Sequence, residues 1–171
     1  PLTVLEQSEL YKRDTFSLKQ FLLDETKTGI IAEFKRKSPS KGIINDHSDV
    51  VEVTKAYAAN GASCLSVLTD EKFFGGTAED LKKARVNQIP ILRKDFIIDE
   101  YQIYESRAIG ADCILLIAAA FMGNKKQLWL LNDLAYRLGM DVLVEVARAD
   151  KHAVVALHQF AQHQQGGFVE V

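Results

Sequence analysis

The sequence is poor in cysteine, proline and tryptophan, and it has no hydrophobic run long enough to cross a membrane. Its two cysteines, Cys64 and Cys113, each lie in an apolar run, so we expect buried free thiols rather than a disulfide framework. The longest apolar run, from Cys113 to Met122, is much shorter than the roughly 20 residues of a membrane helix. The start of the chain also lacks the basic and apolar regions of a signal peptide. We therefore expect a cytoplasmic protein with no membrane partner.

A large excess of charge of either sign is absent as well. The formal net charge is −2 and the pI is about 6.1, which gives no reason to expect nucleic acid as a partner. A length of 171 residues, 47% of them hydrophobic, suffices for one domain with a substantial core. We therefore expect residues 1–171 to form a single domain.

Apolar runs alternate with amphipathic stretches along the chain. Several of the amphipathic stretches end at a glycine, as a helix does when its next residue is left-handed. Strand and helix alternating in this way are typical of βα units in a parallel sheet. The strand-like runs begin near Ile30, Ser63, Ile89, Cys113, Val142 and Phe168.

Polar residues predict where the intervening helices begin. Thr77 and Asp80 have the spacing of a capping box, in which each side chain bonds the other residue's backbone N–H. The other predicted N-caps are Ser48 or Asp49 for a helix at 50–60, Asp99 for one near 100–108, and Asn124 for one at 125–138.

Two architectures fit repeated βα units, a doubly wound sheet and a (β/α)8 barrel. A G-x-G-x-x-G turn after the first strand is missing, which weakens the dinucleotide-binding version of the first. Charged residues at the ends of several strands favour the barrel, whose active site is assembled from many strands. A short amphipathic helix at 16–24 precedes the first strand, and it would cover either the bottom of the barrel or its mouth.

Four charged residues lie at the ends of strand-like runs. Glu33 and Lys35 end the first run, Lys94 ends the third and Glu145 ends the fifth, so they would converge at one mouth. A partly desolvated lysine near other cations has a lowered pKa and suits a proton donor, whereas a carboxylate at an apolar strand end has a raised pKa and suits a base. Two alternatives stay open: an internal ion pair between Lys35 and Glu33, and charges that only mark strand ends.

The segment Ala32–Gly42, AEFKRKSPSKG, resembles the first strand and loop of indole-3-glycerol phosphate synthases. Four later segments resemble the next four strands of the same family, in the same order. The resemblance covers roughly residues 15–146 and implies a TIM barrel, here with about five to six βα units: residues 1–29 would be an N-terminal extension and residues 30–146 units 1 to 5. The four later segments are LSVLTDEKFFGG (65–76), PILRKDFI (90–97), GADCILLI (110–117) and LVEV (143–146).

The resemblance implies a carbon–carbon lyase of tryptophan biosynthesis. This family closes the indole ring of 1-(2-carboxyphenylamino)-1-deoxyribulose 5-phosphate and releases carbon dioxide and water. No metal or organic cofactor is implied, because the substrate's amine supplies electrons and its ketone accepts them.

The same resemblance assigns roles to particular residues. Lys94 would be the general acid at the ketone oxygen, Glu145 the base of the dehydration, and Glu33 a residue that holds substrate and assists proton transfer. Lys35 would bind the substrate's carboxylate or phosphate with Ser38 beside it. The phenylalanines Phe74 and Phe96 would wall the aromatic ring, although core packing is the alternative for each.

Residues 147–171 match the family poorly. The asparagine, arginine and glycine-rich steps that the family's sixth to eighth strands carry are not found, so we expect a weak phosphate site. A barrel without those strands has an open sheet edge, which predicts self-association or a complementing fragment. Two other functions stay open: a non-catalytic barrel fragment, and another phosphosugar TIM-barrel enzyme, against which the KRKSPS loop argues.

Three histidines raise the alternative of a metal site. His152, His158 and His163 would lie on one helix at 151–165, but His152 and His163 would be about 16 Å apart along it at 1.5 Å per residue. We therefore expect a solvated helix face and no metal there.

Overall fold

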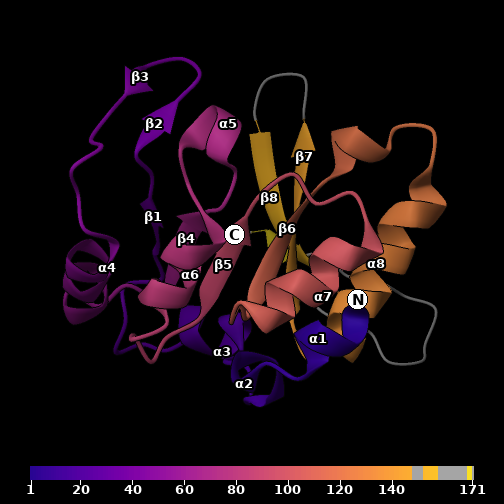
Figure 1. Cartoon of the computed structure of the whole chain (residues 1–171), viewed down its shortest axis with the longest axis horizontal. Coiled ribbons are helices and arrows are strands. Elements are labelled where there is room, and N and C mark those ends of the chain that lie inside the picture. Colours follow the sequence, from indigo (N-terminus) through magenta and orange to yellow (C-terminus); the bar gives the residue numbers. More distant parts are fainter. Residues whose placement is uncertain (148–151, 158–168, 171) are drawn as a thin grey trace.

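Five parallel strands form most of the sheet. The computed structural model describes residues 1–147, 152–157 and 169–170. Neighbouring strands in the order β1-β4-β5-β6-β7 are joined by parallel pairing, with helices in the connections (Figure 1). This is the predicted βα architecture, as expected for part of a (β/α)8 barrel. The strands are β1 (Ile31–Phe34), β4 (Cys64–Leu68), β5 (Ile91–Lys94), β6 (Cys113–Ile117) and β7 (Asp141–Ala147).

The predicted helix caps are confirmed. Asp49 accepts hydrogen bonds from the N–H groups of Val51 and Glu52, and Thr77 and Asp80 form the reciprocal capping box. Asp99 and Asn124 cap the next two long helices. The long helices are α4 (Val50–Ala59), α6 (Ala78–Ala84), α7 (Glu100–Ala108) and α8 (Lys125–Arg137); shorter elements are α5 (Glu71–Phe74), the 3₁₀ turn η1 (Ala118–Phe121) and the hairpin strands β2 (Lys37–Ser38) and β3 (Gly42–Ile43).

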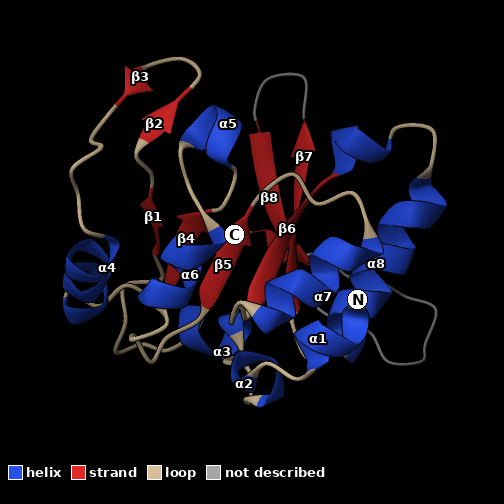
Figure 2. Cartoon of the chain, in the orientation of Figure 1, coloured by secondary structure: helices blue, strands red, loops and turns tan. Residues whose placement is uncertain are grey.

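Alternate residues of each strand enter two different cores. On β4, Leu65 and Val67 join the cluster that includes residues of α4, α6, α7 and α8, which cover one face of the sheet (Figure 2). Cys64, one position earlier, joins an inner cluster instead. This alternation is the period of two expected for a strand buried on both faces. The inner cluster comprises Leu18, Cys64, Leu92, Cys113, Leu115 and Leu143.

The chain before β1 covers the amino-terminal ends of the strands. Leu18, which is 2% exposed, packs in the inner cluster, and its N–H donates to the Asp141 carboxylate at 2.7 Å. This decides the question that the sequence left open, because helix α3 closes the bottom rather than the mouth. The segment contains α1 (Leu2–Glu6), α2 (Glu9–Lys12) and α3 (Leu18–Leu22).

A buried carboxylate joins this segment to the sheet. Asp112, which is 0% exposed, accepts from Arg13 at 2.5 Å and from the Phe16 N–H at 2.8 Å. Its second oxygen accepts from Arg85 and from the Ile91 N–H. One side chain therefore holds the N-terminal segment, the end of α6 and the start of β5 together.

The prediction of a helix at 151–165 is wrong for residues 152–157, the part of this range that the structure describes. His152–Leu157 forms strand β8, which pairs antiparallel with β7 over six residue pairs. The run Ala153-Val154-Val155-Ala156-Leu157 contains two β-branched residues, and the free edge of β7 offers a full ladder of hydrogen bonds, so tertiary pairing outweighs the helical pattern. His152 is thus on a strand, while His158 and His163 lie outside the described residues.

The end of the chain is not a sixth parallel strand. Strand β9 (Val169–Glu170) pairs antiparallel with β8, so the run beginning near Phe168 does not continue the βα series. The complete order is therefore β1-β4-β5-β6-β7-β8-β9. Among the described residues, β1 pairs with β4 alone, which leaves its other edge without a strand.

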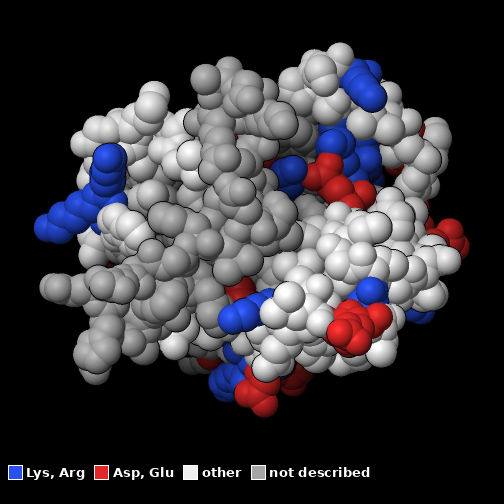
Figure 3. Space-filling view, turned by 180° about the vertical axis from the view of Figure 1, so that it is seen from behind, with Lys and Arg blue, Asp and Glu red and all other residues white. Residues whose placement is uncertain are grey.

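The surface carries mixed charges. On the face shown in Figure 3, basic and acidic side chains lie in small mixed groups rather than in one field of a single sign. Within the part of the chain that the structure describes, no helix combines the length and hydrophobicity that a membrane span requires.

Candidate active site

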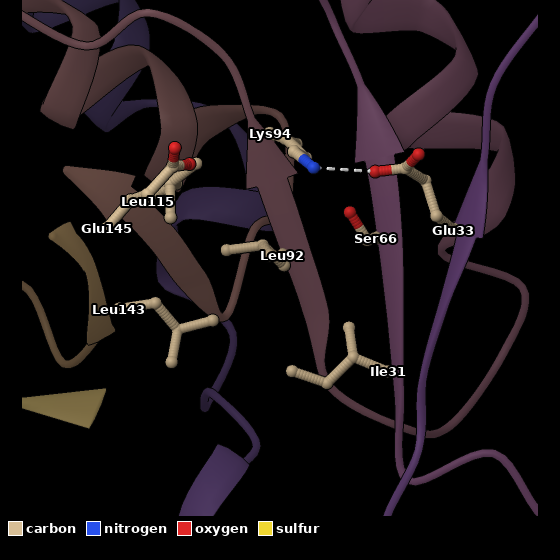
Figure 4. A pocket seen from close by; sticks show the side chains of 8 residues that line it. All are labelled: Ile31, Glu33, Ser66, Leu92, Lys94, Leu115, Leu143 and Glu145. Atoms are coloured by element: carbon tan, nitrogen blue, oxygen red, sulfur yellow. Dashed lines mark hydrogen bonds and ion pairs between the residues drawn. The ribbon is translucent and has the colours of Figure 1, made fainter. Parts of the chain in front are cut away.

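A pocket of about 240 Å³ opens at the carboxyl ends of the five parallel strands. Each strand contributes inward-facing side chains, and Figure 4 shows Lys94 between Glu33 on one side and Glu145 on the other. Apolar side chains form the floor below these three charges. The complete lining is Ile31, Glu33, Ser66, Leu92, Lys94, Leu115, Leu143 and Glu145.

Glu33 is the charged centre of the pocket. Its Oε2 accepts from Lys94 Nζ at 2.8 Å, and its Oε1 accepts from Lys35 Nζ at 2.5 Å. The two lysines come from different strand ends, 61 and 2 positions away in the sequence. The ion pair between Lys35 and Glu33, considered as an alternative above, is therefore present together with the bond to Lys94.

The expectation of a raised carboxylate pKa is wrong for Glu33. Burial alone would raise the pKa of Glu33, but the hydrogen bonds from Lys35 and Lys94 outweigh burial and hold it below its ordinary value. Glu33 is consequently ionised at neutral pH. The general rule failed here because two cations converge on one carboxylate.

This pKa predicts how the stability of the chain depends on pH. A folded-state pKa below the unfolded value gives stability that is present above the ordinary value of 4.5 and is lost as pH falls through the lower folded pKa. We expect Glu33→Gln to be less stable than the original chain at pH 7, and the difference to shrink below about pH 4.5. Urea unfolding between pH 2.5 and 7 measures it.

Glu79→Gln is the matched control, since Glu79 makes only an exposed pair with Lys82 at 3.8 Å. Its effect should stay near zero at every pH. A Glu33→Gln difference that did not change with pH would contradict the ion-pair explanation.

Glu145 reaches the same pocket from β7. It stands at Ile117 of β6 in the parallel register and is half-buried. Because Lys94 and Glu145 come from strands separated only by β6, the predicted acid and the predicted base line one cavity.

Lys35 and Ser38 lie outside the pocket lining. Lys35 follows the end of β1 and contacts the pocket through Glu33. Ser38 belongs to the β2–β3 hairpin, where its Oγ accepts from the Lys41 N–H at 3.2 Å. The structure thus brings Lys35 beside the site, whereas Ser38 is engaged within its own turn.

The base of that hairpin is firmly attached. Arg36 makes two hydrogen bonds to Asp80 of α6, at 2.7 and 2.8 Å, and its carbonyl accepts from the N–H groups of Ile44 and Asn45. Lys37 Nζ donates to the carbonyl of Lys72 at 2.9 Å. These contacts fix the path of the backbone from the end of β1, where Glu33 lies, into the hairpin.

Phe74 and Phe96 form an aromatic cluster with Phe73. The Phe74 and Phe96 rings are 6.2 Å apart and tilted, and the Phe73 and Phe96 rings meet edge to face at 6.0 Å. Phe96 is 45% exposed, so ordinary core packing does not account for it. Phe73 was not predicted, although it directly precedes Phe74 in the sequence.

After this cluster, the backbone at Gly76 passes close to the end of β4. A Cβ at Gly76 would lie 2.0 Å from the Leu68 carbonyl oxygen and 2.5 Å from its carbon, which are backbone atoms of β4. We expect Gly76→Ala to lower the free energy of unfolding by about 2–3 kcal/mol, because backbone must move. Chemical denaturation measures the loss.

Gly42→Ala separates a steric clash from backbone strain. Gly42 has a φ of +66° but nothing within 4 Å of an added Cβ, so it should cost only about 1 kcal/mol. Equal losses for the two variants would contradict the clash at Gly76.

Ser66 is the polar pocket residue that the sequence analysis missed. It lies on β4 opposite Glu33 of β1 and shares the inward parity of Cys64. The available signal was a hydroxyl in the apolar run Cys64-Leu65-Ser66-Val67-Leu68.

The arrangement suits proton transfer to and from a small organic substrate. One ammonium group lies beside an ionised carboxylate, and a second carboxylate lines the same apolar-floored cavity. Across residues 1–147, with 152–157 and 169–170, no group of three metal-ligating side chains comes together.

Comparison with known proteins shows the family of the chain. A family profile described as indole-3-glycerol phosphate synthase matches residues 1–161. A protein of Bacteroides thetaiotaomicron with that name is 52% identical over 130 residues, which are 75% of this chain and 49% of the relative.

Two other relatives carry the same name. The protein of Bordetella pertussis is 53% identical over 125 residues, covering 72% of this chain and 47% of its own, and that of Chromobacterium violaceum is 55% identical over 121 residues, covering 70% and 45%. The chain thus spans about half the length of the relatives it matches. With the profile match and these identities, the chain belongs to the indole-3-glycerol phosphate synthase family.

Proposed function

We propose that this chain carries the proton-transfer site of an indole-3-glycerol phosphate synthase. The substrate would be 1-(2-carboxyphenylamino)-1-deoxyribulose 5-phosphate, and the products indole-3-glycerol phosphate, carbon dioxide and water. The observation that carries the proposal is the single pocket that contains Glu33, Lys94 and Glu145. Family membership supports the choice of substrate.

Lys94 is the general acid in this proposal. Its Nζ donates to the ionised Glu33 carboxylate at 2.8 Å, and this bond holds the amino group in the pocket beside the reacting centre. Lys94 protonates the ketone oxygen as the ring carbon that bears the carboxylate attacks the ketone carbon. A carbon–carbon bond forms, the bond to the carboxylate breaks, and carbon dioxide leaves without its bonding electrons.

Glu145 acts in the second half of the reaction. The ketone oxygen is now a hydroxyl group, which leaves with a further proton as water. Glu145 removes the proton from the neighbouring carbon, and the double bond of the indole forms. Because Glu145 and Lys94 line one cavity, both halves can occur without the intermediate leaving.

The remaining predicted residues bind substrate. Lys35, beside Glu33, is available for the substrate's carboxylate or phosphate, with Ser38 in the neighbouring hairpin. Phe74 and Phe96 wall the aromatic ring. The pocket volume of about 240 Å³ is below the 300–1,000 Å³ usual for ligand sites, so it suits the reacting centre rather than the whole substrate.

Turnover of the carboxyphenylamino-deoxyribulose phosphate by the purified chain tests the proposal. Indole-3-glycerol phosphate should appear as indole fluorescence, with one carbon dioxide released for each product. A folded chain that bound the substrate without product formation would leave only the non-catalytic alternative.

The unpaired edge of β1 favours association. Along Ile31–Phe34, the described part of the chain supplies a strand on one side only, and an open edge can pair with another strand. We therefore include self-association, or pairing with a complementing segment, in the proposal. Light scattering with size-exclusion chromatography should detect a species larger than 19.1 kDa, and a stable monomer would contradict it.

The proposal also places the protein in the cytoplasm. Its two cysteines are free and buried in the inner core, as expected for a protein kept in a reducing compartment.

A further inference from the structure

The Ser66 hydroxyl is buried without a hydrogen-bond partner. Ser66 is 3% exposed, and no donor or acceptor among the described residues bonds its Oγ. Buried hydroxyl groups nearly always have a partner, because leaving one unpaired costs its lost hydration. An unpaired hydroxyl in the wall of a pocket therefore indicates a partner that enters the pocket.

The position of Ser66 shows which part of a ligand it would meet. It pairs with Glu33 on β1 in the strand register and with Leu92 on β5, two positions before Lys94. In Figure 4 its oxygen points up toward the ion pair of Glu33 and Lys94. Apolar side chains, including Ile31 and Leu92, make up the rest of the nearby floor.

We infer that Ser66 is a further substrate-contacting residue, whose hydroxyl donates a hydrogen bond to the substrate oxygen that Lys94 protonates. This inference rests on the proposed function. Ser66 and Lys94 come from the neighbouring strands β4 and β5 and line the same pocket, so an oxygen that lies between them would face two donors. A second donor stabilises the negative charge that develops on that oxygen as the ketone is attacked.

Binding of two matched ligands tests the contact without requiring turnover. The first is 1-(2-carboxyphenylamino)-1-deoxyribitol 5-phosphate, in which a hydroxyl group replaces the ketone, and the second is the same molecule without that hydroxyl group. We expect Ser66→Ala to weaken binding of the first about three- to tenfold and to leave binding of the second unchanged. Calorimetry on the full chain measures both.

Each result has a distinct meaning. If the unsubstituted chain binds both ligands and Ser66→Ala weakens neither or both equally, the Ser66 contact is overturned and the proposed function stands. If the unsubstituted chain binds neither ligand, the proposed substrate is wrong, and the Ser66 contact is wrong with it.

Stability of the free protein gives a second readout. Because Ser66→Ala removes an unpaired polar group, we expect an unchanged or higher unfolding midpoint. Ser63→Ala is the matched control: Ser63 is 0% exposed, and its Oγ accepts from the Gly29 N–H at 3.0 Å. Ser63→Ala should lower the midpoint and leave the binding ratio of the two ligands unchanged. A clear loss of stability in Ser66→Ala would show a structural role and overturn the inference.

Discussion

Lys94→Ala is expected to lower kcat/KM for indole-ring closure by about a hundred- to ten-thousandfold. A positioned general acid contributes about this much, and no other ammonium group lines the pocket of the described chain. The effect should fall mainly on kcat, because the proton is transferred in the transition state. Steady-state fluorescence assays at saturating substrate measure it.

Folding should survive this substitution, since the Lys94 side chain is 38% exposed. Lys83→Ala, on the exposed side of α6, is the matched control and should keep full activity. If the rate of Lys94→Ala stayed within about threefold of the rate of the original chain, Lys94 would be excluded as the general acid.

Asp112→Ala should destabilise the fold by about 3–5 kcal/mol. The substitution leaves Arg13, Arg85 and two backbone N–H groups without their buried acceptor, and breaking such a pair costs about this much. Burial already lowers the pKa of Arg85, and Asp112 acts against that shift, so the charge of Arg85 becomes more costly without it. Urea unfolding followed by circular dichroism measures the loss.

The matched control is Asp133→Ala, which removes an exposed carboxylate 3.5 Å from Arg137. Its effect should be within about 0.5 kcal/mol. If Asp112→Ala cost less than about 1 kcal/mol, the N-terminal segment would be held by its apolar contacts rather than by this carboxylate.

The parts of the fold that local chemistry determines were predicted from the sequence. Side chains such as Asp49 and Thr77 bond the first N–H groups of their own helices, so they mark helix starts without knowledge of the tertiary structure. The sequence also predicted that one site contains Glu33, Lys94 and Glu145, because parallel strands all end at the same edge of the sheet.

The failures depend on contacts that the pattern of residues along the chain does not specify. The segment beginning at His152 became a strand because the edge of β7 was free to pair. The pKa of Glu33 moved opposite to expectation because Lys35 and Lys94 both donate to its carboxylate. Ser66 could not be recognised as unpaired until the neighbouring side chains had positions.

The antiparallel pairing of β8 with β7 has a consequence for symmetry. Strand β8 pairs along the outer edge of β7, the last of the parallel strands. Strand β9, which lies beyond β8, is only two residues long. Within the described chain, the four residues of β1 are an open edge, and on the opposite side of the sheet β9 pairs with only two residues of β8. Two copies that meet through β1 present the same edge to each other, and a twofold axis makes the strands antiparallel. Such a contact uses both β1 edges at once, so assembly by this route stops at a closed dimer instead of growing into a fibre.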